Sequence, residues 1–215
     1  MAARSAHDNA DAIVKTHRKY RLAPYREILA ELIEHAGPID LLKNKRILEL
    51  GPGNRVNLMR FLSEEMGASV RGIGRAPLWP WKPHSDYIAN HVTNAFLLDH
   101  LPGIESQSYD IIYSRHVAEQ HSIHVAILLT SRIYWRYIRE NRFKTPGEDF
   151  PSSLPNIHAI FRHCYRILKP GGVIISQIGR RRYSALDRPF LDTFKPRTIA
   201  ERPLGKMSCM VTFIK

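Results

Sequence analysis

Short apolar runs alternate with amphipathic stretches along most of this chain, and this alternation predicts an α/β fold. Runs that predict strands lie at 46–50, 68–73, 87–92, 109–114, 173–178 and 207–214. Apolar positions at helical spacing predict helices at 56–66 and 157–168 between them. Strands that alternate with helices are typical of a doubly wound, mostly parallel sheet with helices on both faces.

The segment before the first strand has a different pattern and predicts a pair of N-terminal helices. They cover 8–20 and 25–35, with Pro24 between them, and the second ends at Gly37-Pro38. We therefore divide the chain into a helical segment, 1–45, and an α/β domain, 46–215. A length of 215 residues suits this arrangement, because a single hydrophobic core stops growing at about 250–300 residues.

Residues 122–156 do not fit the alternation and predict a helical insertion after the fourth strand. The helix covers 123–143, and a polar loop with several prolines follows it. Three arginines share one face of this helix, and the insertion follows the carboxyl end of a strand, where α/β proteins bind their ligands. One interpretation is a lid that binds substrate, and the other is a packed helix with a solvated basic face. The candidate substrate-binding residues are Arg132, Arg136 and Arg139.

The segment with the clearest chemistry is Ile47-Leu48-Glu49-Leu50-Gly51-Pro52-Gly53-Asn54. A strand that runs into Gly-x-Gly at the start of a helix lets a ligand approach bare backbone amides. An acid, Glu49, stands two residues before the first glycine. Two further segments come later in the expected order. They are Ser114-Arg115-His116-Val117-Ala118-Glu119-Gln120-His121 after the fourth strand and Leu168-Lys169-Pro170-Gly171-Gly172 before the fifth.

Together these segments resemble the class I S-adenosylmethionine-dependent methyltransferases, in the branch that acts on small molecules. The resemblance covers about 47–177. It implies a Rossmann-like sheet of about seven strands, S-adenosylmethionine as cofactor, and in-line methyl transfer that depends on holding the two reactants in geometry for attack. On the matching positions it implies a set of cofactor-binding residues: Glu49, Gly51, Pro52, Gly53, Asn54, Gly74, Arg75, Asn94, Ala95 and Ser114.

Two positions depart from the pattern of that family. Its third loop glycine falls at Arg55, and the acid that ends its second strand and holds the ribose falls at Gly74. Charge-assisted bonds to a ribose contribute roughly 1.5–3 kcal/mol each. Two interpretations follow: an enzyme that holds the ribose in another way, or a methyltransferase fold with weakened cofactor binding that acts as a binding protein.

The histidines after the fourth strand are candidate catalytic groups. His116 or His121 could accept a proton from an acceptor hydroxyl or amine during methyl transfer. The alternative is that they cap a helix and line the cofactor pocket. A metal site is not expected, because only one glutamate accompanies them, and two cysteines form neither a disulfide framework nor a four-cysteine zinc site.

The charge of the chain indicates an anionic partner without naming it. With 32 Lys and Arg against 20 Asp and Glu, the formal net charge is +12, which attracts acidic small molecules, nucleic acid and anionic lipid. We favour a small, anionic acceptor of glycan or lipid type over RNA. DNA methylation is disfavoured, because the segment after the fourth strand lacks the Asp/Asn/Ser-Pro-Pro-aromatic motif that clamps a flipped base, and neither cysteine follows a proline.

A reductase is the least favoured alternative. Arg75 stands where a dinucleotide enzyme holds the 2′-phosphate of NADP, but the glycine fingerprint of the short-chain reductases is absent. The first residues carry no apolar core of a secretory signal, and no apolar run approaches the roughly 20 residues of a membrane span. We therefore expect a cytoplasmic protein, for which peripheral membrane contact stays open and no oligomeric state is predicted.

Overall fold

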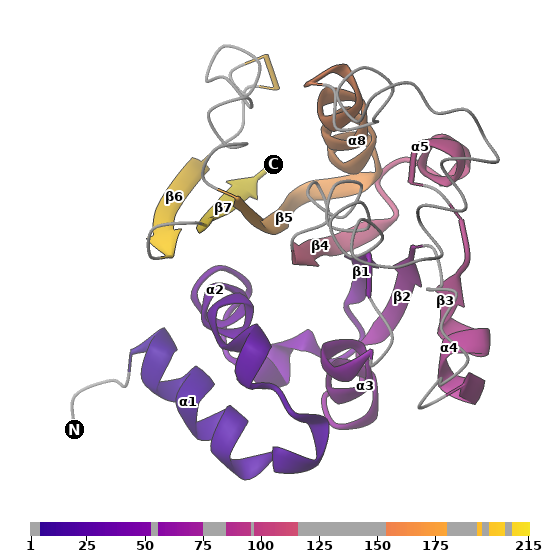
Figure 1. Ribbon diagram of the computed structural model, residues 1–215. Helices are drawn as coiled ribbons and strands as arrows, with labels where there is room; N and C mark the ends of the chain where they lie inside the picture. Colours follow the sequence, from indigo (N-terminus) through magenta and orange to yellow (C-terminus); the bar gives the residue numbers. More distant parts are fainter. Residues whose placement is uncertain are drawn as a thin grey trace, which may run out of the picture.

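The computed structural model describes residues 5–52, 56–74, 85–95, 97–115, 154–179, 193–194, 198–204 and 208–215. Its strands are β1 (Arg46–Leu50), β2 (Ser69–Ile73), β3 (Val92–Thr93), β4 (Tyr109–Arg115), β5 (Leu168–Gly179), β6 (Thr198–Leu204) and β7 (Ser208–Ile214). They form one seven-stranded sheet in the order β3-β2-β1-β4-β5-β7-β6 (Figure 1). β1 to β5 are parallel, and β7 runs antiparallel between β5 and β6. The doubly wound, mostly parallel sheet expected from the sequence is confirmed.

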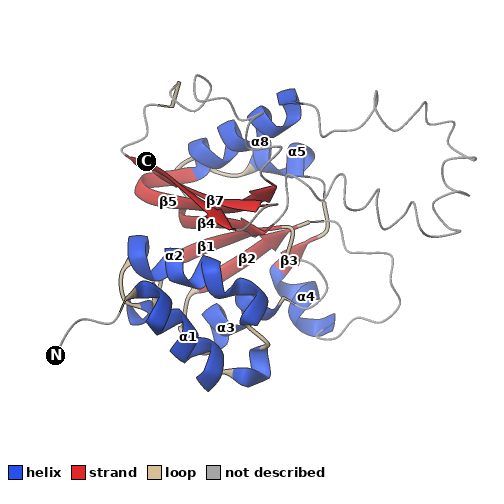
Figure 2. Cartoon of the chain, turned by 60° about the vertical axis from the view of Figure 1, so that its left-hand side comes forward, coloured by secondary structure: helices blue, strands red, loops and turns tan. Residues whose placement is uncertain are grey.

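Helices cover both faces of the sheet (Figure 2). One face carries α1 (Ala6–Thr16), α2 (Arg26–Ala36), α3 (Asn57–Glu64) and α4 (Ser85–His91). The other carries α5 (Leu97–His100) and α8 (Leu154–Ile167). Short 3-10 turns lie at Arg18–Tyr20, Ala23–Tyr25, Ile39–Leu42 and Leu101–Gly103.

The central strands are apolar on both faces, as parallel strands between two helical layers must be. Alternate residues point to opposite sides of the sheet. Ile47 and Ile111 therefore join the core under α1 to α3, whereas Leu48 and Ile112 join the core under α5 and α8. This alternation decides which side chains of β1 and β4 share a face at the functional edge.

Two expectations about single elements are wrong at the level of the backbone. The run 87–92 was expected to be a strand, but most of it belongs to α4, and β3 has only two residues. Tyr87 and His91 stand one helical turn apart and stack at 4.1 Å between ring centroids, while the Tyr87 hydroxyl lies 2.7 Å from the Ser63 Oγ on α3. Docking on α3 therefore outweighs the β propensity of this short apolar run.

The first predicted helix also ends early. α1 begins at a capping box, in which Ser5 Oγ accepts from the Asp8 amide at 3.1 Å, but it ends at Thr16. The backbone of His17, with φ of −101° and ψ of 47°, leaves the helical conformation, and a separate 3-10 turn completes 8–20 before Arg21 ends it with φ of 51°. β6 was not located from the sequence, since Pro203 interrupts its pattern; on an edge strand a proline is tolerated.

Some expectations concern residues beyond the described ones. The insertion at 122–156 lies outside them except for its last three residues, which belong to α8. Within the described part of the chain, no helix has the length and apolar character needed to cross a membrane. No group of three or more His, Cys, Asp or Glu side chains in that part is placed to hold a metal ion, and Cys164 and Cys209 are both buried and form no disulfide.

Candidate functional site

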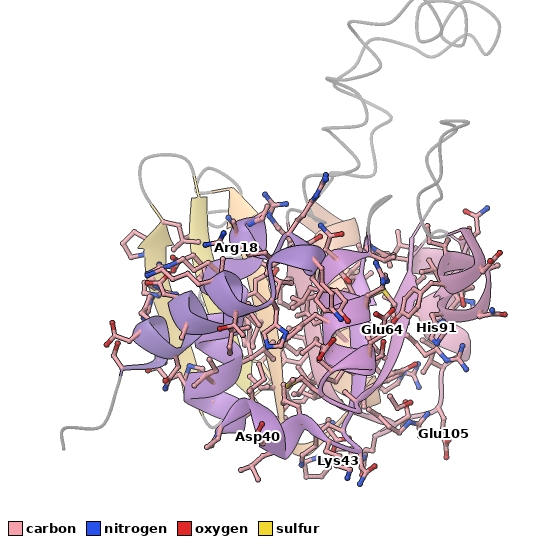
Figure 3. The ribbon with its side chains drawn as sticks, turned by 90° about the horizontal axis from the view of Figure 1, so that it is seen from below. Arg18, Asp40, Lys43, Glu64, His91 and Glu105 are labelled. Atoms are coloured by element: carbon pink, nitrogen blue, oxygen red, sulfur yellow. The ribbon has the colours of Figure 1, made fainter. Side chains whose placement is uncertain are left out.

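The carboxyl ends of β1, β2 and β4 meet at one edge of the sheet. Glu49 pairs in register with Gly72 on β2 and with Tyr113 on β4. The residues that follow, Gly51, Gly74 and Arg115, therefore leave the three strands at the same level. Asp40, Lys43 and Glu105 lie along the opposite border, where the strands begin (Figure 3). In open α/β sheets, ligands bind outside the carboxyl ends of the strands.

Glu49 is a carboxyl group buried at this edge. Its residue is 1% exposed, and the Tyr113 hydroxyl donates to its Oε2 at 2.7 Å. Burial raises the pKa of Glu49 to about 8, although the bond from Tyr113 and the positive charge of Arg115 both oppose the rise. Burial likewise raises the pKa of Tyr113 well above its usual range, so this phenol stays a donor. A buried acid with so perturbed a pKa in a ligand-binding position is a candidate functional residue.

The turn after β1 lies directly on β2. Gly51 has a φ of 66°, and its amide donates to the Ile73 carbonyl oxygen at 2.8 Å. A Cβ added at Gly72 would come within 2.9 Å of Pro52 Cγ, and one added at Gly74 within 3.1 Å of Gly51 Cα. Gly72 on β2 and Gly74 directly after it therefore let the Gly51-Pro52 turn pack so closely. This contact gives a physical reason for Gly74 at the position where the resembling family carries an acid.

The other expected cofactor-binding residues in the described part surround this turn. Ser114 is buried, and its Oγ lies 2.7 Å from the Ser176 Oγ on β5. Asn94 and Ala95 follow β3, where the Ala95 amide donates to the Thr93 carbonyl at 3.1 Å. The structure thus brings seven sequence-predicted residues to the carboxyl edge, with Glu49 at the centre. Those outside the described residues are Gly53, Asn54, Arg75, His116, His121, Arg132, Arg136 and Arg139.

Two residues of the site were not assigned a role from the sequence. Tyr113 bonds to Glu49, and Arg115 lies on the same face of β4, with its Cζ 5.4 Å from the centroid of the Tyr25 ring. The period of two along β4 was visible in the sequence. What was missing was the register between β1 and β4, which places Tyr113 beside Glu49.

Comparison with known proteins identifies solved structures that share this fold. No protein-family model matches the chain, and no curated protein matches it. Solved structures do match. One is from Galdieria sulphuraria and is assigned as a sarcosine dimethylglycine methyltransferase, with a TM-score of 0.54, 16% identity, and coverage of 92% of this chain and 87% of that one.

Two further structures give the same result. Phosphoethanolamine N-methyltransferase 2 of Haemonchus contortus, in complex with S-adenosyl-L-methionine, has a TM-score of 0.54 at 12% identity, over 89% of this chain and 52% of that one. Precorrin-6y C5,15-methyltransferase of Geobacter metallireducens has a TM-score of 0.51 at 13% identity, over 88% of each chain. The chain has the Rossmann-like fold of the class I S-adenosylmethionine-dependent methyltransferases.

Proposed function

We propose that this protein is an S-adenosylmethionine-dependent methyltransferase that acts on a small, anionic acceptor. The observation that carries the proposal is Glu49: a buried carboxyl of raised pKa, held by Tyr113, beneath a glycine turn at the carboxyl edge of this fold. Burying such a group in a polar cluster lowers stability, and a cationic ligand offsets that cost.

The residues present fit the amino-acid part of S-adenosylmethionine. The cofactor, when bound, supplies a methyl group on a sulfonium. Glu49 would accept from the ammonium group, and Tyr113 holds the carboxylate in place through Oε2. The Gly51 backbone, with φ of 66°, forms a turn that a residue with a side chain would adopt only under strain. These groups bind and orient, which is where most of the rate in such a transfer arises. His116 or His121 would take the proton of the acceptor.

The distribution of charge supports an anionic acceptor. The described residues hold 16 of the 32 Lys and Arg and 14 of the 20 Asp and Glu, so the remaining segments hold 16 and 6. Nearly all of the excess positive charge thus belongs to the remaining segments, and four of these begin within three residues of the carboxyl ends of β1, β2, β4 and β5. Positive charge that follows a binding edge raises the local concentration of anionic substrates.

Calorimetry with three ligands tests the proposal. S-adenosylhomocysteine, NADP and a short RNA are titrated separately into the full chain, followed by a methyl-transfer assay with labelled S-adenosylmethionine and a panel of anionic small molecules. We expect S-adenosylhomocysteine to bind and NADP not to bind. Binding of S-adenosylhomocysteine without transfer to any acceptor would favour the binding-protein interpretation. No binding of S-adenosylhomocysteine would overturn the proposal.

Charge reversal on the predicted insertion tests the acceptor class. Replacing Arg132 and Arg136 together with glutamate should raise the acceptor KM about tenfold or more and leave the affinity for S-adenosylhomocysteine within about twofold, because only the acceptor loses its counter-charges. Steady-state kinetics and calorimetry measure the two effects. If RNA were the acceptor, each lost phosphate contact should lower the slope of log K against log salt by about one. An unchanged KM would remove the two arginines from the acceptor site.

Gly74, directly after β2, provides a separate test of the turn after β1. Gly74→Ala should weaken S-adenosylhomocysteine binding about tenfold, because the new Cβ would lie 3.1 Å from Gly51 Cα and 3.2 Å from Pro52 Cδ and would displace the turn. Gly103→Ala is the matched control, since an added Cβ there meets no atom within 4 Å. Calorimetry and thermal unfolding of both variants separate an effect on binding from an effect on stability. Equal affinities in the two variants would show that the turn does not touch the ligand.

A further inference from the structure

A positively charged side chain beside Glu49 has a buried nitrogen without a hydrogen-bond acceptor among the described residues. Arg115 is the last residue of β4, two positions after Tyr113, so it shares a sheet face with Tyr113 and Glu49. The two groups are close enough for the charge of Arg115 to lower the pKa of the Glu49 carboxyl and partly oppose the effect of burial. No hydrogen bond between them is found, however, and the carboxyl is bonded by Tyr113 instead.

The guanidinium of Arg115 contacts an aromatic ring, but its Nε has no acceptor among the described residues. Its Cζ lies 5.4 Å from the centroid of the Tyr25 ring, a cation–π contact that orients the group without using its N–H donors. Its Nε is buried, and among the described residues it has no hydrogen-bond partner. Buried donors are almost always paired in folded proteins, so an acceptor that belongs to a ligand is the simplest explanation.

The geometry of a guanidinium identifies the acceptor it suits. Nε and one terminal nitrogen form a rigid fork that matches the two oxygens of a carboxylate. The anion that binds there would stand beside Glu49, which itself suits a cation. A cation-binding and an anion-binding group side by side match a zwitterion, such as the ammonium and carboxylate on one amino-acid carbon.

We propose that Arg115 binds the carboxylate of the amino-acid part of S-adenosylmethionine while Glu49 receives its ammonium group. This inference rests on the proposed function and extends it: Arg115 makes the site specific for adenosyl ligands that retain the carboxylate. A ligand of this kind pairs the Arg115 guanidinium and the Glu49 carboxylate at once. A ligand with the amine alone would leave the buried Nε unpaired.

The test compares two ligands that differ only in the carboxylate. S-adenosylhomocysteine and its decarboxylated analogue are titrated calorimetrically at about pH 8.5, above the pKa of about 8 for Glu49. Arg115→Gln should lower the affinity for S-adenosylhomocysteine about tenfold to a hundredfold and leave that for the decarboxylated analogue within about twofold. Wild-type protein should prefer S-adenosylhomocysteine by a similar factor.

Two further variants keep the result interpretable. Arg46→Gln is the matched control, because Arg46 has the same 5.4 Å contact with an aromatic ring, that of Tyr109, but lies at the amino end of β1. It should leave both affinities unchanged. Arg115→Lys keeps the charge but loses the fork, and should weaken S-adenosylhomocysteine binding several-fold. It provides the test if the glutamine variant fails to fold.

The possible failures are distinct. If Arg115→Gln weakens both ligands equally, Arg115 is a structural residue that supports Glu49, and the proposal is overturned. If neither variant of Arg115 changes the binding of S-adenosylhomocysteine, the carboxylate binds elsewhere, and the proposal is equally overturned. If the wild-type protein binds neither adenosyl ligand, the proposed function itself fails together with the inference built on it.

Discussion

Glu49→Gln is expected to make the ligand-free protein more stable at alkaline pH and to remove most of its affinity for S-adenosylhomocysteine. The carboxyl has a pKa of about 8 in the folded protein against 4.5 for an exposed glutamate, because burial disfavours its charged form. The folded state therefore holds this proton more tightly than the unfolded state. Its contribution to stability is fully present below about pH 4.5 and is lost as the pH rises to about 8.

The size of this effect follows from the difference between the two pKa values. It corresponds to at most about 5 kcal/mol, reached above about pH 8. Glutamine removes the charge but keeps an oxygen that can accept from Tyr113. The variant should therefore not lose stability as the pH rises. Urea unfolding at about pH 5 and pH 9 should show wild-type and variant nearly equal at the lower pH and several kcal/mol apart at the higher. Glu105→Gln, at the exposed opposite border (Figure 3), should follow the wild type at both.

Binding should show the complementary change. The ionised carboxylate is the form that accepts from an ammonium group, so wild-type affinity for S-adenosylhomocysteine should fall about tenfold for each pH unit below about 8. Glu49→Gln should lower the affinity about a hundredfold and abolish this pH dependence. The ionisable groups that influence the pKa of this carboxyl are Tyr113 and Arg115 on β4, and its own charge contributes to the raised pKa of Tyr87 on α4. Two results would each mean that Glu49 is not the group that titrates and binds the ammonium. One is the same change of unfolding free energy with pH in wild type and variant, and the other is an affinity of the variant that still depends on pH.

The sequence was sufficient for those parts of the fold and site that depend on local pattern. Continuous apolar runs predicted β1, β2 and β4 to within a residue or two, and Gly51 and Pro52 predicted the turn that follows β1. In each case the signal lies within one short segment. The prediction was wrong for α4, because contacts with α3 favour a helix there over the strand that a run of six residues predicted. No local pattern contains these contacts.

Features that depend on register could not be predicted in the same way. Gly74 was interpreted as a missing acid, whereas its position against Gly51 and Pro52 is visible only when β1 and β2 are aligned. Arg115 belongs to the segment at the end of the fourth strand that resembles the family, but its position on the same sheet face as Glu49 requires the pairing of β1 with β4. Parallel pairing joins residues far apart in the chain, so its energetics do not appear in the composition of either strand.

A second large effect is expected where the two ends of the chain are held together. Glu31 on α2 is 5% exposed, and Arg202 on β6 donates to its Oε1 through Nη2 at 2.8 Å and Nε at 3.1 Å. The Thr212 hydroxyl on β7 donates to Oε2 at 2.7 Å. Arg202 also donates through Nη1 to Glu27 at 2.7 Å. α2 is thus fixed to the C-terminal hairpin through the buried carboxylate of Glu31 and the half-buried carboxylate of Glu27.

Arg202→Met should therefore destabilise the protein by about 3–5 kcal/mol, because it removes the guanidinium from the buried Glu31 carboxylate and leaves beside it the Thr212 hydroxyl and the His35 Nε2, 3.2 Å from Oε2. The double variant Arg202→Met with Glu31→Gln should recover a large part of this loss, since the amide carries no charge and can still accept from Thr212. Arg18→Met, on an exposed turn (Figure 3), should change stability by less than about 0.5 kcal/mol. Urea unfolding of the four proteins measures each step. A single Arg202 variant within about 1 kcal/mol of wild type would show that the rest of the α2 interface, including the bond from Thr212, is sufficient to hold the helices on the sheet.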